Sequence, residues 1–318
     1  MTRILTTPDH APVSRFAFGT MQFGGRADAA QSAEMYDACR AAGITHFDTA
    51  WVYNEDESEK ILGRLIKGER DKLLIATKVG YTGGAGAANM RAQFETCRAR
   101  LDLDMVDVLY LHRFDPETDL NETLECFASL KQQGLIRYVG LSNFAAWQVV
   151  KAQMIGAKYD LSIDILQPMY SLVKRQAEVE ILPMCADQDI AIAPYSPLGG
   201  GLLTGKYAAG SGEGRLQEDP RYNSRYGQDW MHRAAADLAT LAQELGTDPA
   251  TLAVAWVAAH SSGPMPIISG RTAEQLAPSL AAMDFDMSAD LYARISALSP
   301  RPAPATDRLE EQDEGISA

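Results

Sequence analysis

The stretch from residue 72 to residue 112 decides the fold of this chain. It begins with Lys72-Leu-Leu-Ile-Ala-Thr-Lys78 and ends with Val106-Asp-Val-Leu-Tyr-Leu-His112, two short apolar runs of the kind that form buried strands. Between them, apolar side chains recur at helical spacing, at Met90, Phe94, Cys97 and Leu101. A strand, a helix and a second strand in this order are typical of a parallel sheet that is covered by helices.

The same alternation of strand and helix continues outward in both directions. We predict eight strands, at Arg15–Thr20, Ile44–Thr49, Lys72–Lys78, Val106–His112, Ile136–Ser142, Ile163–Gln167, Ile190–Ser196 and Pro266–Ser269. One of the helices between them should begin at Asp248-Pro249, because Asp caps a helix and Pro suits its first position. Eight such units predict a closed (β/α)8 TIM barrel, and the G-x-G-x-x-G motif of an open dinucleotide-binding sheet follows none of the strands.

We expect residues 1–318 to form a single barrel domain. An α/β barrel takes about 250 residues as one domain, so the length does not require a second domain. The barrel core should span about 12–300, and residues 301–318 should form a mobile acidic tail at the surface. One long irregular stretch, Ser196–Trp230, follows the seventh strand, where we expect a loop that clasps a ligand.

The composition of the chain limits the classes of partner that we expect it to bind. The net charge of -13 argues against nucleic acid and anionic membranes, which both require a basic surface, and leaves a small molecule as the expected partner. No apolar run approaches the roughly 18 residues of a membrane span, and the N-terminus has no signal-peptide pattern. The four cysteines are expected to be buried free thiols of a cytoplasmic protein, without zinc-binding spacing: Cys39, Cys97, Cys126 and Cys185. Composition leaves the oligomeric state open.

Polar residues stand at the ends of most of the predicted strands. In chain order they are Gly19-Thr20-Met21, Asp48 with Tyr53 five residues on, Lys78, His112, Ser142-Asn143, Gln167, Tyr195-Ser196 and Ser269-Gly270-Arg271. Capping of helices explains Ser, Asn and Asp at such positions, and Ser142-Asn143 could cap a helix near Ala145. Capping rarely explains Lys, His and Gln at three separate ends. Because barrel active sites are built at the C-terminal ends of the strands, this pattern predicts a site there.

Four of these residue types suit proton transfer. A tyrosine has an ordinary pKa near 10, and a lysine ammonium beside the phenol lowers that pKa. A carboxylate can hold the lysine charged, and an imidazole can hydrogen-bond the oxygen of a substrate. Asp48, Tyr53, Lys78 and His112 supply these groups. Lys78 could instead be a strand-end lysine that reaches solvent, or the Schiff-base lysine of an aldolase.

The chain resembles the aldo-keto reductases along most of its length. The matching segments, in the order of that family, are Phe18–Gly24, Phe47–Asn54, Ala76–Val79, Asp107–His112, Ile136–Phe144, Gln167, Tyr195–Lys206 and Ile268–Gln275. The resemblance implies an (α/β)8 barrel that binds NADP(H), or less often NAD(H), and reversibly reduces an aldehyde or ketone to an alcohol. It also implies that Tyr53 is the general acid and base, that Lys78 with Asp48 lowers its pKa, and that His112 orients the carbonyl oxygen.

The resemblance further implies which residues hold the cofactor. Ser142, Asn143 and Gln167 would bind the carboxamide, Tyr195 would stack on the nicotinamide, and Ser196, Leu198, Gly200 and Lys206 would follow the pyrophosphate. Ser269, Gly270, Arg271, Thr272 and Gln275 would surround the adenosine and its 2′-phosphate, and the remaining cofactor residues are Gly19, Thr20, Met21, Asp48 and Ser279. Pro278-Ser279 replaces the Glu-Asn that is common in the family, so the contacts near the adenine depart from its pattern. The cations Arg271 and Lys206 favour NADP(H) over NAD(H).

The substrate pocket is expected to include Trp51, Tyr81 and Arg113, which follow three of the strand ends. Two other functions are kept beside carbonyl reduction. One is a cofactor-binding sensor or regulatory subunit with little turnover, and the other is the aldolase that uses Lys78.

Overall fold

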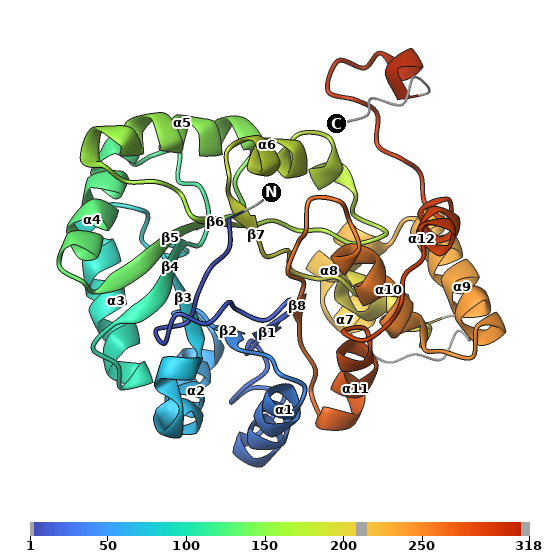
Figure 1. Cartoon of the computed structure of the whole chain (residues 1–318), viewed down its shortest axis with the longest axis horizontal. Coiled ribbons are helices and arrows are strands. Elements are labelled where there is room, and N and C mark those ends of the chain that lie inside the picture. Colours follow the sequence, from blue (N-terminus) through green and yellow to red (C-terminus); the bar gives the residue numbers. More distant parts are fainter. Residues whose placement is uncertain (1–2, 208–214, 313–318) are drawn as a thin grey trace.

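Eight parallel strands close into a barrel. The computed structural model describes residues 3–207 and 215–312. The strand order is β7-β6-β5-β4-β3-β2-β1-β8. Backbone hydrogen bonds from Met265 to Ile192 (2.8 Å) and from Ile267 to Pro194 (2.9 Å) join the two ends of the sheet. Figure 1 shows the helices as a ring around the strands, so the predicted (β/α)8 barrel is confirmed.

All eight predicted strands are present, although most are shorter than expected. Their bounds are β1 Ala17–Gly19, β2 His46–Asp48, β3 Leu74–Val79, β4 Val106–Leu111, β5 Ile136–Ser142, β6 Ile165–Gln167, β7 Ala191–Ile192 and β8 Ile267–Ile268. The predicted ranges ran past the ladder because the chain stays extended and apolar while it leaves the sheet. Beyond β7, for example, Tyr195 still donates a backbone hydrogen bond to Pro168 (2.9 Å).

Twelve α-helices and seven 3-10 helices lie in the described ranges 3–207 and 215–312. The α-helices are α1 Ala29–Ala41, α2 Glu57–Leu65, α3 Ala87–Leu101, α4 Leu120–Gln132, α5 Ala146–Gly156, α6 Ile181–Asp187, α7 Arg215–Glu218, α8 Pro220–Tyr226, α9 Asp229–Glu244, α10 Pro249–Ala258, α11 Ala273–Ala281 and α12 Ala289–Ser296. The 3-10 helices are η1 Asn54–Asp56, η2 Ile66–Gly68, η3 Arg70–Lys72, η4 Ala157–Tyr159, η5 Gln176–Glu178, η6 Gly199–Thr204 and η7 Leu309–Gln312. The start of α10 is as predicted, since the Asp248 carboxylate accepts from the backbone of Ala250 (2.7 Å).

The prediction of one long irregular loop at Ser196–Trp230 is wrong for its described residues. The helices η6, α7 and α8 lie in this stretch, and α9 begins before the stretch ends. Asp219 caps α8 by accepting from the backbone of Arg221 (2.9 Å), with Pro220 at the first helical position. This Asp-Pro start is the same signal that we used at α10. Residues 208–214 of the stretch lie outside the described part.

The N-terminal segment closes the floor of the barrel. Leu5 is 1% exposed and packs among the apolar residues of the interior. Arg3 pairs with Asp164, and Arg137 donates to the Thr6 carbonyl oxygen (2.8 Å), which holds the segment across the lower rim. The packed core therefore begins several residues before residue 12, where we had expected it. The four cysteines are buried free thiols, as predicted.

At the other terminus, residues 301–312 of the expected acidic tail are described and mostly exposed up to residue 310, whereas residues 313–318 lie outside the described part. Among the residues that the structure describes, no helix combines the length and the apolar composition needed to cross a membrane.

Two aromatic residues fill the interior directly beneath the mouth. Tyr110 of β4 is fully buried, and a Cβ atom on Gly140 of the neighbouring β5 would lie 2.3 Å from its ring. His46 lies two residues before Asp48 on β2, is 0% exposed, and has no described hydrogen-bond partner at either ring nitrogen. Burial, with a smaller contribution from the Lys78 charge, lowers the pKa of His46 to about 3.

This burial predicts a stability that decreases as the pH falls. The unfolded chain takes up a proton at His46 near pH 6.5, whereas the folded chain does not, so lowering the pH from about 7 to about 5 should remove about 2 kcal/mol of the free energy of unfolding. Urea unfolding measures the free energy of unfolding at both pH values. The decrease from about pH 7 to about pH 5 should be about 2 kcal/mol smaller in His46→Leu than in the wild type. The control is His232→Gln on the exposed side of α9, which should keep the wild-type pH dependence. An unchanged loss in His46→Leu would contradict the assignment.

Candidate active site

The predicted proton-transfer residues meet at the mouth of the barrel. Lys78 stands near the end of β3 and is 0% exposed. Its ammonium group donates to the carboxylate of Asp48, to the backbone oxygen of Thr49 (2.8 Å) and to the hydroxyl of Tyr53 (3.4 Å). Because parallel strands end at the same rim, residues that are 25 and 30 positions apart in the chain become neighbours.

His112 completes the group of four. It follows β4 directly, and its backbone donates to Val79 of β3 (2.8 Å). The Tyr53 ring stands edge-on to the imidazole with 6.0 Å between the centroids, and the Lys78 nitrogen lies 5.1 Å from the centre of the Tyr53 ring. The structure thus brings together all four residues that the sequence singled out.

The buried lysine stays charged. Burial is the largest single influence and favours the neutral amine, but Asp48 and Tyr53 together outweigh it and hold the pKa of Lys78 above its ordinary value. The second oxygen of Asp48 accepts from the amide nitrogen of Gln167 across the barrel (2.9 Å). Both oxygens of the carboxylate therefore have donors, as a buried ion pair requires.

Tyr53 differs from the expectation of a lowered pKa. Lys78 does lower the pKa of the phenol, as predicted, but burial outweighs it and the pKa lies above its ordinary value. The sequence could not show this, because it does not reveal how deeply the hydroxyl is buried. In this structure Tyr53 is a protonated phenol next to a fixed ammonium group, which is the form of an acid that can donate a proton.

His112 is a neutral imidazole. Burial, reinforced by the charges of Lys78 and Arg113, lowers the pKa of His112 to about 3. Its Nδ1 atom is buried and has no hydrogen-bond partner in the described part of the chain. A neutral imidazole retains one N–H, so His112 can donate a hydrogen bond to a substrate oxygen without carrying a charge.

A patch of amide and hydroxyl groups lies beside these four residues. The Ser142 hydroxyl donates to the backbone oxygen of Gln167 (3.1 Å), and the Asn143 amide donates to the backbone oxygen of His112 (2.9 Å). The Tyr195 hydroxyl donates to the Asn143 side-chain oxygen (2.6 Å). The alternative that Ser142-Asn143 caps a helix is wrong, since Ala145 occupies the cap of α5.

A glycine-lined cradle follows β7. Gly199, Gly200 and Gly201 have positive φ angles of 56°, 67° and 98°. The N–H groups of Gly199 and Gly201 already donate to the backbone oxygens of Ser196 (2.9 Å) and Leu198 (3.0 Å), so an anion at this turn would depend on a nearby cation. The Lys206 ammonium lies 3.6 Å from the place that a Cβ atom on Gly201 would take, so a cation borders the cradle. These residues fit a pyrophosphate, as do Ser196 and Leu198 at the start of the same turn.

The expected adenosine end lies beyond β8. The Ser269 hydroxyl donates to the backbone oxygen of Gly19 (2.8 Å), and the Thr272 hydroxyl accepts from the backbone of Gln275 (3.2 Å), capping α11. Gly270 lies between them, and the side chain of Arg271 makes no ion pair with any residue in 3–207 or 215–312. A free guanidinium at this place fits a 2′-phosphate.

Two of the expected cofactor residues are buried. The Ser279 side chain is 0% exposed on α11, and the Thr20 hydroxyl is 0% exposed and shares hydrogen bonds with Ser58 (2.8 Å) and the backbone oxygen of Asp48 (3.2 Å). The Ser279 hydroxyl has no hydrogen-bond partner among the described residues, and the cofactor contacts of both residues stay predictions. Met21, by contrast, is 37% exposed at the mouth.

The expected pocket residues separate into two sets. The Tyr81 ring lies 4.9 Å from His112, and the guanidinium of Arg113 lies 4.7 Å from the centre of the Tyr81 ring. Trp51 instead packs beneath Arg100 of α3 (5.5 Å), and its indole nitrogen is buried. Trp51 as a pocket wall therefore has less support from the structure than the other two.

One residue near the site was missed. The Tyr110 ring lies 5.8 Å from the Lys78 nitrogen, beneath the ion pair. Alternation along β4 could have revealed it, because Tyr110 lies two positions before His112 and such residues share one face of a strand.

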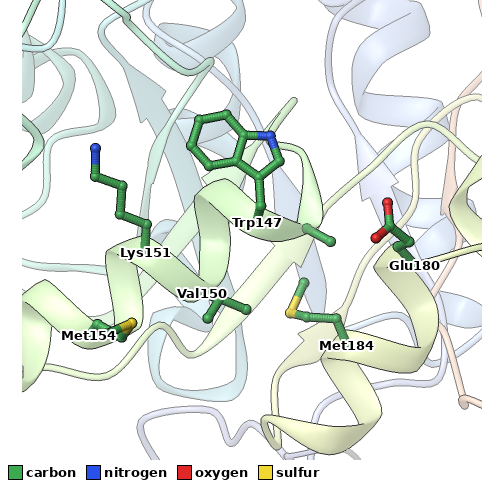
Figure 2. Close-up of a pocket in the computed structure, with 7 residues that line it drawn as sticks. Trp147, Val150, Lys151, Met154, Glu180 and Met184 are labelled. Carbon is green, nitrogen blue, oxygen red and sulfur yellow. The ribbon is translucent and has the colours of Figure 1, made fainter. Parts of the chain in front are cut away.

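A hollow on the outside of the barrel lies apart from this site. It has a volume of about 490 Å³ and is formed by α5 and the start of α6. Figure 2 shows its lining side chains, namely Trp147, Val150, Lys151, Met154, Glu180 and Met184. None of these residues belongs to a strand end, so this hollow is not part of the candidate active site.

Comparisons with known proteins agree with the fold. The model of the Aldo/keto reductase family matches residues 15–300, most of the barrel. The chain belongs to the aldo/keto reductase family, a family of oxidoreductases.

Three similar proteins cover most of the chain. The oxidoreductase YrpG of Bacillus subtilis (strain 168) is 32% identical over 92% of this chain and 94% of its own length. A probable voltage-gated potassium channel subunit beta of Oryza sativa subsp. japonica is 32% identical over 86% of this chain and 88% of its own length. The solved structure of a glycerol dehydrogenase from Gluconobacter oxydans superposes with a TM-score of 0.81 at 25% identity, over 95% of this chain and 97% of that one.

The buried ion pair predicts that removing one of its two charges destabilises the protein more than removing both. Lys78→Met should reduce the free energy of unfolding by about 3–5 kcal/mol, because it leaves the Asp48 carboxylate buried without its counter-charge. Adding Asp48→Asn should recover much of that loss, as urea unfolding of both variants would show. Lys60→Met, at a surface pair with Asp56 and Glu57, is the matched control and should change stability little. A double variant no more stable than Lys78→Met would contradict the buried-charge argument.

Proposed function

We propose that this protein catalyses the reversible, NADP(H)-dependent reduction of an aldehyde or ketone to an alcohol. The observation that carries the proposal is the chain of contacts from Asp48 through Lys78 to the Tyr53 hydroxyl, beside a neutral His112. A protonated phenol and an imidazole N–H at one point can together bind a carbonyl oxygen. The glycerol dehydrogenase similarity agrees with chemistry at an alcohol carbon.

The bound cofactor would supply the hydride, and the residues of the chain would do the rest. Tyr53 would donate the proton to the carbonyl oxygen in reduction and accept it in oxidation. Lys78 would stabilise the phenolate that Tyr53 becomes, and His112 would orient the oxygen by a hydrogen bond. The amide and hydroxyl patch at Asn143 and Gln167 suits a carboxamide.

The cofactor preference rests on two cations. Lys206 beside the glycine cradle suits the pyrophosphate, and Arg271, which has no ion pair within residues 3–207 and 215–312, suits a 2′-phosphate, so NADP(H) is favoured over NAD(H). A cytoplasmic location accords with four buried free cysteines.

Of the two rivals, the regulatory one has an observation in its favour. The similarity to a probable voltage-gated potassium channel subunit beta supports a role as a regulatory subunit. The aldolase has less support, because a nucleophilic lysine needs a lowered pKa and Asp48 raises the pKa of Lys78.

The first test is Tyr53→Phe. The loss of the acidic hydroxyl should reduce kcat for an activated aromatic aldehyde by about 10²-fold or more, followed by NADPH absorbance. The Kd for NADPH, measured by fluorescence, should change little. A Tyr53→Phe variant that kept most of its activity would show that another group is the acid. Tight NADPH binding without turnover of any carbonyl by the wild type would favour the regulatory function.

The second test is the pH profile of aldehyde reduction. kcat/KM should stay level from about pH 5 to about pH 9, because His112 remains neutral above its lowered pKa and Tyr53 remains protonated below its raised pKa. A fall in kcat/KM below about pH 6.5 that disappears in His112→Gln would mean that the imidazole titrates at its ordinary value.

A further inference from the structure

An aromatic wall leads from the four central residues to a cation at the mouth. The ring of Tyr53 is 6.0 Å from His112, the ring of Tyr81 is 4.9 Å from His112, and the guanidinium of Arg113 is 4.7 Å from the Tyr81 ring. Each member touches the next, so Arg113 is joined to the reacting centre by a continuous row of side chains. Its charge is also felt there, since it contributes to the lowered pKa of His112.

The guanidinium of Arg113 lies open at the surface. Arg113 is exposed and forms no ion pair with any residue of the described ranges. The nearest acidic residue in the sequence is Asp115, two positions further along. Its oxygens accept from the Thr118 hydroxyl (2.6 Å) and from the backbones of Ala85 (2.9 Å) and Glu117 (3.1 Å). These hydrogen bonds, with a smaller contribution from the charge of Arg113, lower the pKa of Asp115, but no direct ion pair joins the two side chains.

Two other arginines near the mouth each form an ion pair with a carboxylate of the protein. Arg100 pairs with the buried carboxylate of Glu59 (3.2 Å). Arg221, on α8, pairs with Asp219 (2.8 Å). In a chain with a net charge of -13, an unpaired cation beside the mouth therefore provides a local attraction that most of the surface does not.

The stacking on Tyr81 also fixes how Arg113 can bind. A guanidinium that lies against a ring has one face covered, while its N–H groups point outward in its own plane. This edge matches the two oxygens of a carboxylate, which it can bind in a bidentate manner. A neutral group can accept only a weaker hydrogen bond from it, and a cationic group is repelled.

We propose that Arg113, held on Tyr81, makes this site selective for carbonyl compounds that carry a second, anionic group, with a carboxylate as the best match. The inference rests on the carbonyl reduction proposed above. The carbonyl oxygen would lie between Tyr53 and His112, and the carboxylate would extend along the Tyr81 wall to the guanidinium.

The test compares two substrates that differ in charge. 4-Carboxybenzaldehyde and its methyl ester, together with the two 3-substituted isomers, have similar aldehydes, but only the acids are anions. We expect kcat/KM with NADPH to favour the acid over the ester by about tenfold in at least one of the two positions, as one charged hydrogen-bonded contact at an exposed site permits. Arg113→Gln should abolish that preference, and Arg113→Glu should reverse it. Added NaCl should weaken the preference of the wild type.

The matched control is Arg221→Gln, which removes an arginine whose charge is already paired and which should keep the preference for the acid. An acid preference that survives in Arg113→Gln would overturn the assignment to Arg113. Reduction of the esters without any preference for the acids would overturn this inference and leave the proposed function standing. Failure to reduce any of the four compounds would overturn both.

Discussion

The arrangement of the site depends on the buried ion pair between Lys78 and Asp48. Two charges without access to water are stable only when each finds enough partners. The ammonium group uses Asp48, Thr49 and Tyr53, and the carboxylate uses Lys78 and Gln167. Because these contacts occupy the donors of Lys78, the position of the Tyr53 hydroxyl follows from the need to satisfy the lysine.

The barrel makes this pair possible. Asp48 and Lys78 come from the neighbouring strands β2 and β3, whereas Gln167 comes from β6, so its contact with Asp48 crosses the mouth between strands that are far apart in the sheet order. Closure through backbone hydrogen bonds between the β7 and β8 sides holds those strands at fixed distances. Beneath the pair, the absence of a side chain at Gly140 leaves the space that the Tyr110 ring fills.

Burial shifts the pKa values of Tyr53 and His112 in opposite directions, and each shift keeps the group in its neutral, hydrogen-bond-donating form. It raises the pKa of Tyr53, which keeps the phenol protonated, and it lowers the pKa of His112, which keeps the imidazole neutral. Both groups are therefore hydrogen-bond donors at neutral pH, while Lys78 carries the positive charge next to Tyr53. In the proposed reaction, this charge would stabilise the phenolate that remains after Tyr53 gives up its proton.

The amino-acid sequence by itself determined the fold class and the members of the site. The alternation of strands and helices predicted the barrel, and Asp48, Lys78 and His112 could be singled out because strand ends of a barrel meet at one rim. The helix α8 was missed because its Asp-Pro start, a signal that we used at α10, was not recognised. The strand ranges were too long because the chain stays extended after it leaves the hydrogen-bonded ladder.

Only the tertiary structure decided how these residues act on one another. The net direction of the Tyr53 pKa depends on whether burial or the Lys78 charge prevails, and a sequence contains neither the depth nor the distance. The same holds for Trp51 and Arg113, which both follow a strand end. One packs beneath Arg100, and the other stacks on Tyr81 at the mouth, because side-chain direction is set by neighbours that come from distant parts of the chain.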